Sequence, residues 1–541
     1  MASIIQIARS VRSTLIVLSV LGFGQRALAL DAQLVEQLAT GDISGKVEAI
    51  GTFVASGDPA GLPLLRALQE GNLAVTPSGQ VILSEDGVIK DAVTMQPVEP
   101  APEEYESVGI NNRVRGALES AFSAFSLYSP ARDERLEAAR QLADSPSASI
   151  GTILDKVLPG ETDAQIRDLL AQVKAAIDLS SDDPKARLAA VKTLGQSSSQ
   201  RTKSVLFPLL EKDASGTFLE PDARVREEAE FAIGMIDRRL TLSDYAGRLF
   251  SGISLGSILL LAALGLAITY GLLGVINMAH GEMIMIGAYA TFVTQQVMRT
   301  HAPAWLEWYP VLALPMAFTA AALVGMALER TVIRWLYGRP LETLLATWGI
   351  SLFLIQLVRQ IFGAQNVEVA NPSWMSGGIA FTNLTLPYNR IIIIFFAFAV
   401  LAAVWLVLSR TRLGLFVRGV TQNRTMAACV GVPTARVDLL AFGLGSGIAG
   451  LAGCALAQIG NVGPDLGQST IIDSFMVVVL GGVGQLAGTV YAALGLGVAM
   501  KFMEPYIGAV PTKILILVLI IAFIQKRPQG LFALKGRAVE A

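Results

Sequence analysis

The chain has 541 residues, of which 52% are apolar and 16% are charged, and its formal net charge is −2. These averages hide two unlike parts. Residues 1–246 carry 24 Lys and Arg against 34 Asp and Glu, whereas residues 247–541 carry 18 against 10. With two Cys, two His and no basic stripe on its charged part, the composition argues against a disulfide scaffold, a zinc protein and a nucleic-acid binder.

The first thirty residues have the pattern of an export signal. Arg9 and Arg12 precede a short apolar run, 14–23, and residues 27–29 supply an A-x-A cleavage site. The apolar run is about half as long as a membrane span. The sequence therefore predicts a signal peptide over residues 1–29, with an uncleaved N-terminal anchor as the alternative. Either way, the segment that follows is expected outside the cytoplasm.

Residues 30–246 are predicted to form an exported, acidic helical domain. Four segments share a basic residue followed by an apolar helical pattern, and they begin at Lys46, Arg135, Arg187 and Arg226. Asp-Pro or Pro-Asp pairs near three of them mark helix boundaries. The pattern is similar to HEAT-like helical repeats, and because the spacing is irregular, an ordinary helical bundle is the alternative.

Two further features of this domain bear on its role. Two β-type runs around Asp86-Gly87 predict a small hairpin. The domain contains neither His nor Cys, and its carboxylates are spread over helix faces. We therefore expect a docking surface rather than a catalytic site.

Residues 247–541 contain the apolar runs that a polytopic membrane protein needs, each close to the roughly 20 residues that cross a bilayer. Six clear runs lie at 249–276, 283–298, 309–328, 344–362, 391–409 and 437–459, and three shorter runs lie at 471–484, 486–500 and 511–524. The predicted fold class is all-α, with about eight membrane elements.

The placement of Lys and Arg predicts the orientation of these spans. Twelve of the 18 basic residues fall into three segments, 330–339, 410–436 and 526–537, which we assign to the cytoplasm. Counting spans back from Arg330 places residue 246 outside, in agreement with the export signal. The C-terminus is expected in the cytoplasm.

Polar residues between the first two spans are candidates for a translocation pathway. Asn277, His280 and Glu282 lie beside three glycines, at 271, 274 and 281. Polar groups and irregular backbone at membrane depth require shelter by protein or by a water-filled path, and glycine-interrupted helices often mark substrate sites. The alternative is a short cytoplasmic turn, with Glu282 at a helix N-terminus.

Glycines recur elsewhere in the membrane half. Gly443, Gly447, Gly450 and Gly453 follow helical spacing, and Gly481, Gly482 and Gly484 interrupt a later run. Small residues allow close helix packing in membranes, so a packing role is predicted for all seven. The G-x-G-x-x-G match at 445–450 lies inside an apolar span with no preceding strand, which argues against nucleotide binding.

Three segments resemble the permease subunits of branched-chain amino acid-type ABC importers: residues 271–283, residues 418–432 running into 443–453, and residues 477–484. They follow the family's order and cover essentially all of residues 247–541. The resemblance implies a bacterial inner-membrane subunit that is not an enzyme and binds no cofactor. It also implies a second permease subunit, two cytoplasmic ATPase subunits that bind ATP, and a periplasmic substrate-binding protein.

The resemblance further implies a coupling element and a substrate. The residues expected to meet an ATPase are Thr421, Gln422, Asn423, Arg424, Met426, Ala427, Ala428 and Gly431, with an ordinary cytoplasmic loop as the alternative. The exported extension resembles the urea-importer branch, which implies urea or a similar small amide or amino acid; a branched-chain amino acid importer is the alternative. Rival classes are a channel or secondary transporter without ATPase partners, and a membrane-anchored signalling or enzyme module.

Overall fold

The computed structural model describes residues 31–56, 61–85, 88–100, 102, 104–274, 277–381 and 384–532. The predicted signal peptide lies outside the described residues. The chain divides into two compact units, residues 1–239 and 240–541. The long helix α11 (Ala223–Leu273) begins in the first unit and ends in the second.

The first unit is built mainly from helices with apolar faces turned inward. They are α2 (Ala32–Thr40), α3 (Ile43–Ser56), α4 (Gly61–Glu70), α5 (Asn112–Ser126), α6 (Arg132–Asp144), α7 (Gly151–Val157), α8 (Ala164–Asp178), α9 (Pro184–Leu194) and α10 (Gln200–Leu206). Short 3₁₀ turns occupy 148–150, 158–160 and 207–210. Side-chain caps fix several helix starts: Asp183, for example, accepts a hydrogen bond from the Lys185 amide as Pro184 opens α9.

A small antiparallel sheet interrupts these helices. Its strands are β1 (Leu73–Val75), β2 (Val81–Glu85), β3 (Val88–Asp91) and β4 (Glu106–Ser107), in the order β3-β2-β1-β4. β2 and β3 pair across the position of the expected hairpin. The sequence pattern did not predict β1 and β4, which are too short to show a β-type alternation.

The arginines that mark three of the repeat-like segments make equivalent contacts. Nη1 of Arg135, Arg187 and Arg226 lies within 3.2 Å of the carbonyl oxygens five and six residues earlier. Arg135 also pairs with Glu161, and Arg187 with Glu220, each carboxylate lying just before a later helix. The shared sequence pattern therefore corresponds to a recurring contact with the loop before each helix, and in two of the three segments also to an ion pair that reaches a later helix.

The second unit consists largely of long helices. They are α12 (His280–His301), α13 (Tyr309–Thr331), α14 (Pro340–Phe362), α15 (Tyr388–Arg410), α16 (Arg412–Gln422), α17 (Arg424–Cys429), α18 (Thr434–Ala457), α19 (Leu466–Gly481), α20 (Leu486–Ile507) and α21 (Ala509–Lys526). Turns of 3₁₀ helix lie at 303–308, 333–336 and 373–375, and a two-stranded sheet pairs β5 (Gly378–Phe381) with β6 (Leu384–Pro387).

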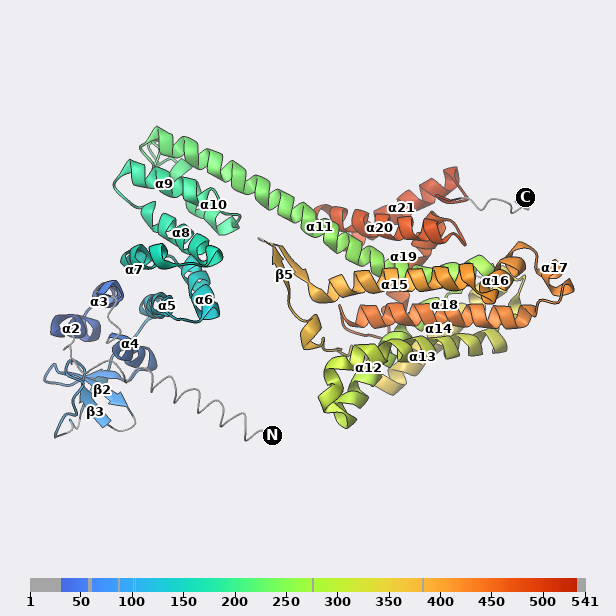
Figure 1. The fold of residues 1–541 in the computed structure, drawn as a ribbon, viewed down its shortest axis with the longest axis horizontal. Helices are drawn as coiled ribbons and strands as arrows, with labels where there is room; N and C mark the ends of the chain where they lie inside the picture. The colour runs from blue at the N-terminus through green and yellow to red at the C-terminus, as the bar shows by residue number, and fades with distance from the viewer. Residues whose placement is uncertain are drawn as a thin grey trace. The chain divides into compact units, whose positions relative to one another are not determined.

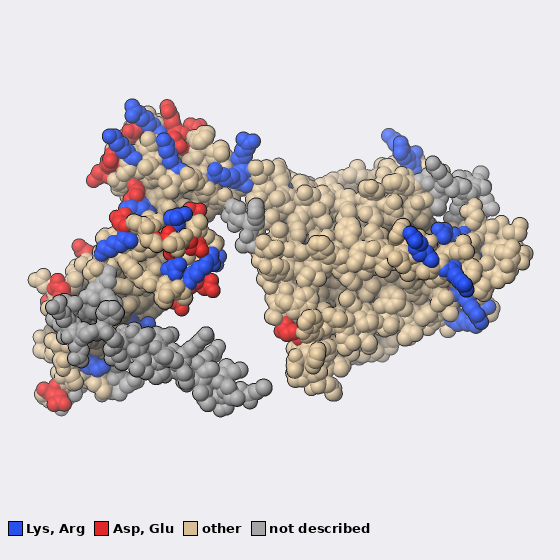
Figure 2. All heavy atoms as spheres, in the orientation of Figure 1, with Lys and Arg blue, Asp and Glu red and all other residues tan. Residues whose placement is uncertain are grey.

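Seven helices among the described residues are long and apolar enough to cross a membrane, and α19 is a shorter apolar helix. This agrees with the predicted polytopic α-helical domain. In Figure 1, α15 runs from the end of this unit that carries β5 to the end that carries α16 and α17. On the face shown in Figure 2, Lys and Arg gather at the α16–α17 end, and the surface between the two ends is almost free of charge.

The interior of the second unit centres on α12, α13 and α18. Apolar residues of these helices share one buried cluster with α11, α19, α20 and α21. The first four turns of α12 are buried almost throughout, although most of the other long helices expose an apolar face. α12 is therefore an inner helix, and the segment that leads into it lies deep in the unit.

Candidate functional site

The described residues between α11 and α12, which are 274 and 277–279, are not helical. Asn277 lies among them, whereas His280 and Glu282 lie in the first turn of α12. Gly274 ends α11 with a φ of +64°, a conformation that favours glycine. The Asn277 side chain accepts a hydrogen bond from the Ala279 amide at 3.0 Å, which starts the turn into α12. Each polar residue is buried: Asn277 is 2% exposed, His280 0% and Glu282 1%.

A contact of His280 shows how deep this segment lies. Its Nε2 is 3.0 Å from the carbonyl oxygen of Ala262, eleven residues before the end of α11. At 1.5 Å per residue, this is about 16 Å back along the helix. The chain therefore turns at Gly274 and re-enters the unit before α12 begins. This geometry favours the membrane-depth hypothesis over a short exposed turn.

Glu282 faces two other helices. Ser351 of α14 donates a hydrogen bond to its Oε1 at 2.8 Å. Its Oε2 points toward Gly467 at the start of α19, where an added Cβ would lie 2.8 Å from that oxygen. The starts of α12 and α19 thus meet at Glu282, and the glycines at 281 and 467 make that close approach possible.

Each of the three residues keeps a buried polar atom without a hydrogen-bond partner. These atoms are Nδ2 of Asn277, Nδ1 of His280 and Oε2 of Glu282. Because Nε2 of His280 faces a carbonyl oxygen, that nitrogen carries the proton and Nδ1 is left as an acceptor. Buried polar atoms are almost always satisfied by protein or water, so these three atoms call for water or a polar solute.

The predicted packing glycines lie where helices touch. On α18, a Cβ at Gly443 would strike Met326, one at Gly447 Phe318, and one at Gly450 the backbone of Ala317, all on α13. Gly453 lies against the backbone of α12 at Ile284. α18 thus fits between α12 and α13 through its glycine-lined faces.

The later glycines form a second break that touches the first. Gly481 of α19 packs against Gly488 of α20, and Gly482 and Gly484 have φ values of +99° and +79° between them. A Cβ at Gly271, near the end of α11, would lie 2.6 Å from the Cα of Gly484. The chain breaks after α11 and after α19 are therefore neighbours.

The predicted coupling residues form a short exposed helix and its flanks. Asn423 caps α17 by accepting a hydrogen bond from the Met426 amide at 2.9 Å, and Gly431 ends the segment with a φ of +86°. Met426 is 62% exposed, and Ala428 is exposed beside it. α17 thus presents a small-residue, partly apolar surface at the basic end of the unit.

Two of the predicted coupling residues bind α17 to its surroundings: Ala427 is buried, and Arg424 is partly exposed but tied to α18. Ala427 is buried with Val417, Val437 and their neighbours. Arg424 forms an ion pair with Asp438, whose side chain is 1% exposed, and stacks over the Tyr337 ring. These contacts hold α17 against α18, so Arg424 and Ala427 fix its position and the other residues present its surface.

A cavity joins the coupling segment to the two chain breaks. It measures 520 Å³ and is lined by Gly271, Gly484, Gln485, Trp405, Arg418, Thr421 and Gln422, among others. Sequence patterns gave no sign of this arrangement, because its lining residues come from four separate stretches of chain. Two predicted coupling residues, Thr421 and Gln422, therefore share one cavity with the breaks after α11 and α19.

One charged pair inside the membrane half was not predicted from the sequence. Lys513 of α21 donates a hydrogen bond at 2.8 Å to Oδ2 of Asp473 on α19. The Lys513 side chain is 50% exposed on this unit although it lies within a candidate span, and Oδ1 of Asp473 has no hydrogen-bond partner. Asp473 is visible in the sequence as a carboxylate within an apolar run, and that pattern could have identified it.

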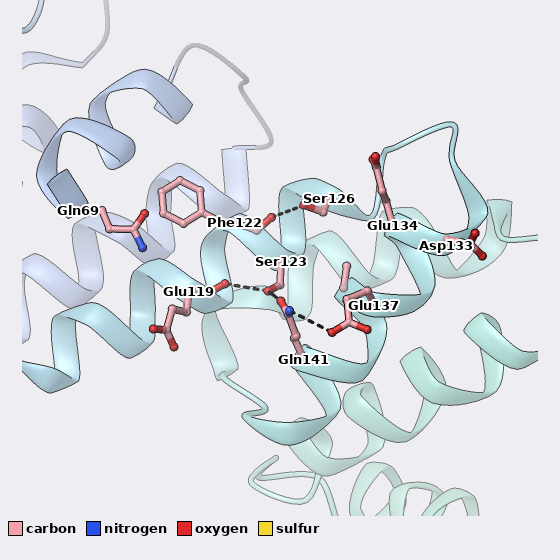
Figure 3. Close-up of a pocket in the computed structure, with 10 residues that line it drawn as sticks. Gln69, Glu119, Phe122, Ser123, Ser126, Asp133, Glu134, Glu137 and Gln141 are labelled. Atoms are coloured by element: carbon pink, nitrogen blue, oxygen red, sulfur yellow. Dashed lines mark hydrogen bonds between the residues drawn. The ribbon is translucent and has the colours of Figure 1, made fainter. Parts of the chain in front are cut away.

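The first unit offers a different surface. A hollow of 600 Å³ beside α5 and α6 is lined by four carboxylates, those of Glu119, Asp133, Glu134 and Glu137 (Figure 3). Gln141 lies among them and donates to Glu137 at 3.4 Å. Within the described part of the chain, no group of three or more His, Cys, Asp and Glu side chains is placed to hold a metal ion.

The apolar helices, the buried polar break and the exposed α17 together define a membrane transport subunit. Comparison with known proteins agrees. The family model "Branched-chain amino acid transport system / permease component" matches residues 248–524, just over half of the chain, and the chain belongs to this family.

The individual proteins that this chain resembles are permeases of the same kind. The high-affinity branched-chain amino acid transport system permease protein BraD of Pseudomonas aeruginosa is 31% identical over 298 residues, which cover 53% of this chain and 95% of BraD. LivH of Escherichia coli K12, with the same description, is 28% identical over 291 residues, covering 52% of this chain and 94% of LivH. No solved structure matches the chain.

Proposed function

We propose that this chain is a translocation subunit of an ATP-driven importer, with α17 as the element that receives motion from a cytoplasmic ATPase. The family membership and the exposed, small-residue surface of α17 support this proposal. The partners it requires are a second permease subunit, two ATPase subunits and an exported substrate-binding protein. The chain itself would catalyse no reaction, and ATP would be bound by its partners.

The pathway proposed for the solute runs past Asn277, His280 and Glu282. Their unpaired buried atoms can offer a donor and two acceptors to water or to a polar solute. This segment lies between the starts of α12 and α19, where backbone groups of two helix N-termini are also near. A polar solute would find hydrogen-bonding partners here that the surrounding apolar helices cannot supply.

The comparisons favour a branched-chain amino acid as the solute over urea, which was our first prediction from the sequence. Both relatives described above carry branched-chain amino acid transport in their names. The Lys513–Asp473 pair supports the same substrate, because a zwitterion needs one cationic and one anionic partner. A charge inside a membrane span costs about 3 kcal/mol, so a half-exposed Lys513 is expected to face a partner subunit or a water-filled path.

Urea is retained as a second candidate for one reason. The family match leaves residues 1–247 outside it, and an exported helical extension of this kind resembles the urea-importer branch. On this hypothesis the extension is periplasmic and docks the binding protein, with its acidic hollow near α5 and α6 as part of the docking surface (Figure 3).

Reconstitution distinguishes the two solutes. The chain would be assembled with its partner subunits in proteoliposomes that contain ATP, and uptake of labelled leucine and labelled urea would be measured side by side. We expect leucine uptake that unlabelled isoleucine competes away and that excess urea leaves unchanged. Uptake of urea with no uptake of leucine would overturn the amino acid proposal and leave the importer proposal standing.

A further inference from the structure

The end of the second unit that carries β5 and β6 has a basic hollow that the transport proposal does not use. It measures 750 Å³ and is formed by α11, β6, α15 and α20. Three cationic side chains line it, those of Arg248, Arg390 and Lys501. Because this end lies opposite the basic α16–α17 end, a cluster of cations here departs from the pattern of the rest of the unit.

The three cations stand where helices enter the apolar region. Arg248 directly precedes the apolar part of α11, which begins at Leu249. Arg390 is the third residue of α15 and precedes its run of isoleucines. Lys501 lies in the last two turns of α20. This is the level at which lipid headgroups meet a membrane protein.

The charges in the hollow do not cancel. Asp244 pairs with Arg248 and Glu504 with Lys501, each at 2.6 Å. Arg390 has no carboxylate partner among the residues that the structure describes. The five charged groups of the lining therefore leave one net positive charge, centred on Arg390.

Hydrogen-bond donors without partners in the hollow also favour an anionic ligand. Nε and Nη1 of Arg248 are buried and have no hydrogen-bond partner, because Asp244 takes only its Nη2. Three hydroxyl groups, those of Ser243, Ser251 and Thr385, also line the hollow. A buried guanidinium with free N–H groups is matched by an oxyanion with several acceptor oxygens, such as a phosphate.

Apolar surface adjoins these polar groups. Phe250 and Pro505 contribute to the lining. Leu249 is 46% exposed and Tyr506 is 71% exposed, and the Tyr506 ring lies 5.2 Å from the Arg248 guanidinium. A ligand here would have a phosphate bound by arginines and a hydrocarbon part along the outer faces of the helices.

We propose that this hollow binds the headgroup of an anionic phospholipid, with Arg390 and Arg248 holding its phosphate. The neighbouring apolar faces favour a lipid over a free phosphate ion, since only a lipid would use them. A phosphatidylglycerol-type headgroup also offers glycerol hydroxyls to Ser251 and Thr385. A bound headgroup would tie α11, α15 and α20 together at the membrane boundary.

Lipid retention tests this proposal on the full-length chain. The protein would be purified in mild detergent from membranes that contain both phosphatidylglycerol and phosphatidylcholine, and bound lipids would be counted by native mass spectrometry. We expect phosphatidylglycerol to be retained in preference to phosphatidylcholine. Arg390→Gln should lower the affinity of the protein for phosphatidylglycerol about tenfold, which is the usual effect of losing one charge-assisted hydrogen bond.

Two further variants keep the test decisive. Arg410→Gln removes an arginine from the opposite end of the same helix and should leave lipid retention unchanged. Arg390→Lys keeps the charge and should preserve part of the lipid retention. Equal retention of the two lipids, or normal retention by Arg390→Gln, would overturn the proposal. If inorganic phosphate displaces the lipid at equal concentration, the site binds a soluble anion and the lipid assignment is wrong.

Discussion

At the scale of single residues, the membrane half is organised by a few buried polar groups in an apolar interior. Asn277, His280 and Glu282 could be selected from the sequence because polar residues and glycines stand together between two apolar runs. Their partners could not be selected in this way, because Ser351 is 69 residues from Glu282 and Gly467 is farther still. Periodicity identifies a residue that must be sheltered, but only the packing of helices shows what shelters it.

The Lys513–Asp473 pair gives a prediction about substrate recognition. Lys513→Met should abolish leucine uptake, because it leaves the Asp473 carboxylate, whose side chain is 12% exposed, without its cation. The double variant Lys513→Met/Asp473→Asn removes both charges and should insert normally. We expect it to transport leucine at least about tenfold less well than the unmodified protein. Full recovery of leucine uptake in the double variant would mean that the pair is structural only.

Buried ion pairs in the first unit predict its response to acid. Burial alone would raise the pKa of Glu220, but hydrogen bonds from Arg187 and from the Asp222 amide outweigh it, so the pKa lies below the ordinary 4.5. A hydrogen bond from Arg135 likewise lowers the pKa of Glu161. Because the folded pKa values are depressed, the stability that these groups contribute is present at neutral pH. It is lost as the pH falls below about 4.5 and through the folded values.

Glu220→Gln tests this account. It should destabilise the first unit by about 3 kcal/mol at neutral pH, because it leaves Arg187, only 11% exposed, without its anion. The loss should shrink at low pH, where Glu220 is protonated in the unmodified protein as well. The loss of stability is measured by hydrogen exchange of α8 to α10 in the full-length protein. Asp133→Asn, at a carboxylate 98% exposed, is the control and should change nothing measurable. Equal protection in both variants would contradict the account.

At the scale of elements, the helices could be predicted from the sequence better than the contacts of the breaks between them. The nine predicted apolar runs correspond to α11 to α15 and α18 to α21 among the described residues, because apolar length is a strong signal in a membrane protein. The contact between Gly271 and Gly484 was not predicted, since it joins breaks more than two hundred residues apart. The inward direction of Ala427 also depends on how α17 packs, which spacing alone does not reveal.

α17 supplies a prediction at this scale. Ala428→Glu places a bulky charge on the exposed side of the helix, and we expect the purified chain to insert normally but to lose its ATPase subunits in a pull-down experiment. Ala428→Ser, which stays small, should retain them. Ala427→Glu should instead impair folding, because Ala427 is buried against Val417 and Val437. Normal ATPase binding by Ala428→Glu would rule out α17 as the docking helix.

At the scale of the whole molecule, charge distinguishes two units of different composition. The acidic character of the first unit and the sparse charge of the second were evident from composition, and the structure divides the chain at residue 239, close to the change. Lys and Arg gather at the α16–α17 end on the face shown in Figure 2, and the assignment of that end to the cytoplasm stays a prediction from the sequence. The solute could not be predicted from composition, because it depends on a small number of polar groups.

Cysteine labelling tests the proposed sidedness. Cys429 is exposed on α17 and Cys454 is buried, so the natural chain carries one accessible reporter. An impermeant maleimide added to intact spheroplasts should leave Cys429 unmodified until the membrane is opened. The variant Asp133→Cys/Cys429→Ser, at a side chain 98% exposed, should be modified at once from outside. Labelling of both positions from the same side would contradict the proposed topology.

The most direct test of the importer proposal is solute uptake with and without the motor. Proteoliposomes that contain both permease subunits, the binding protein and internal ATP would be prepared with the ATPase subunits and without them, and leucine accumulation would be compared. We predict accumulation against a gradient only when the ATPases are present and ATP is hydrolysed. Equal uptake without the ATPases would show that the chain is a channel or a secondary transporter, and it would contradict the account.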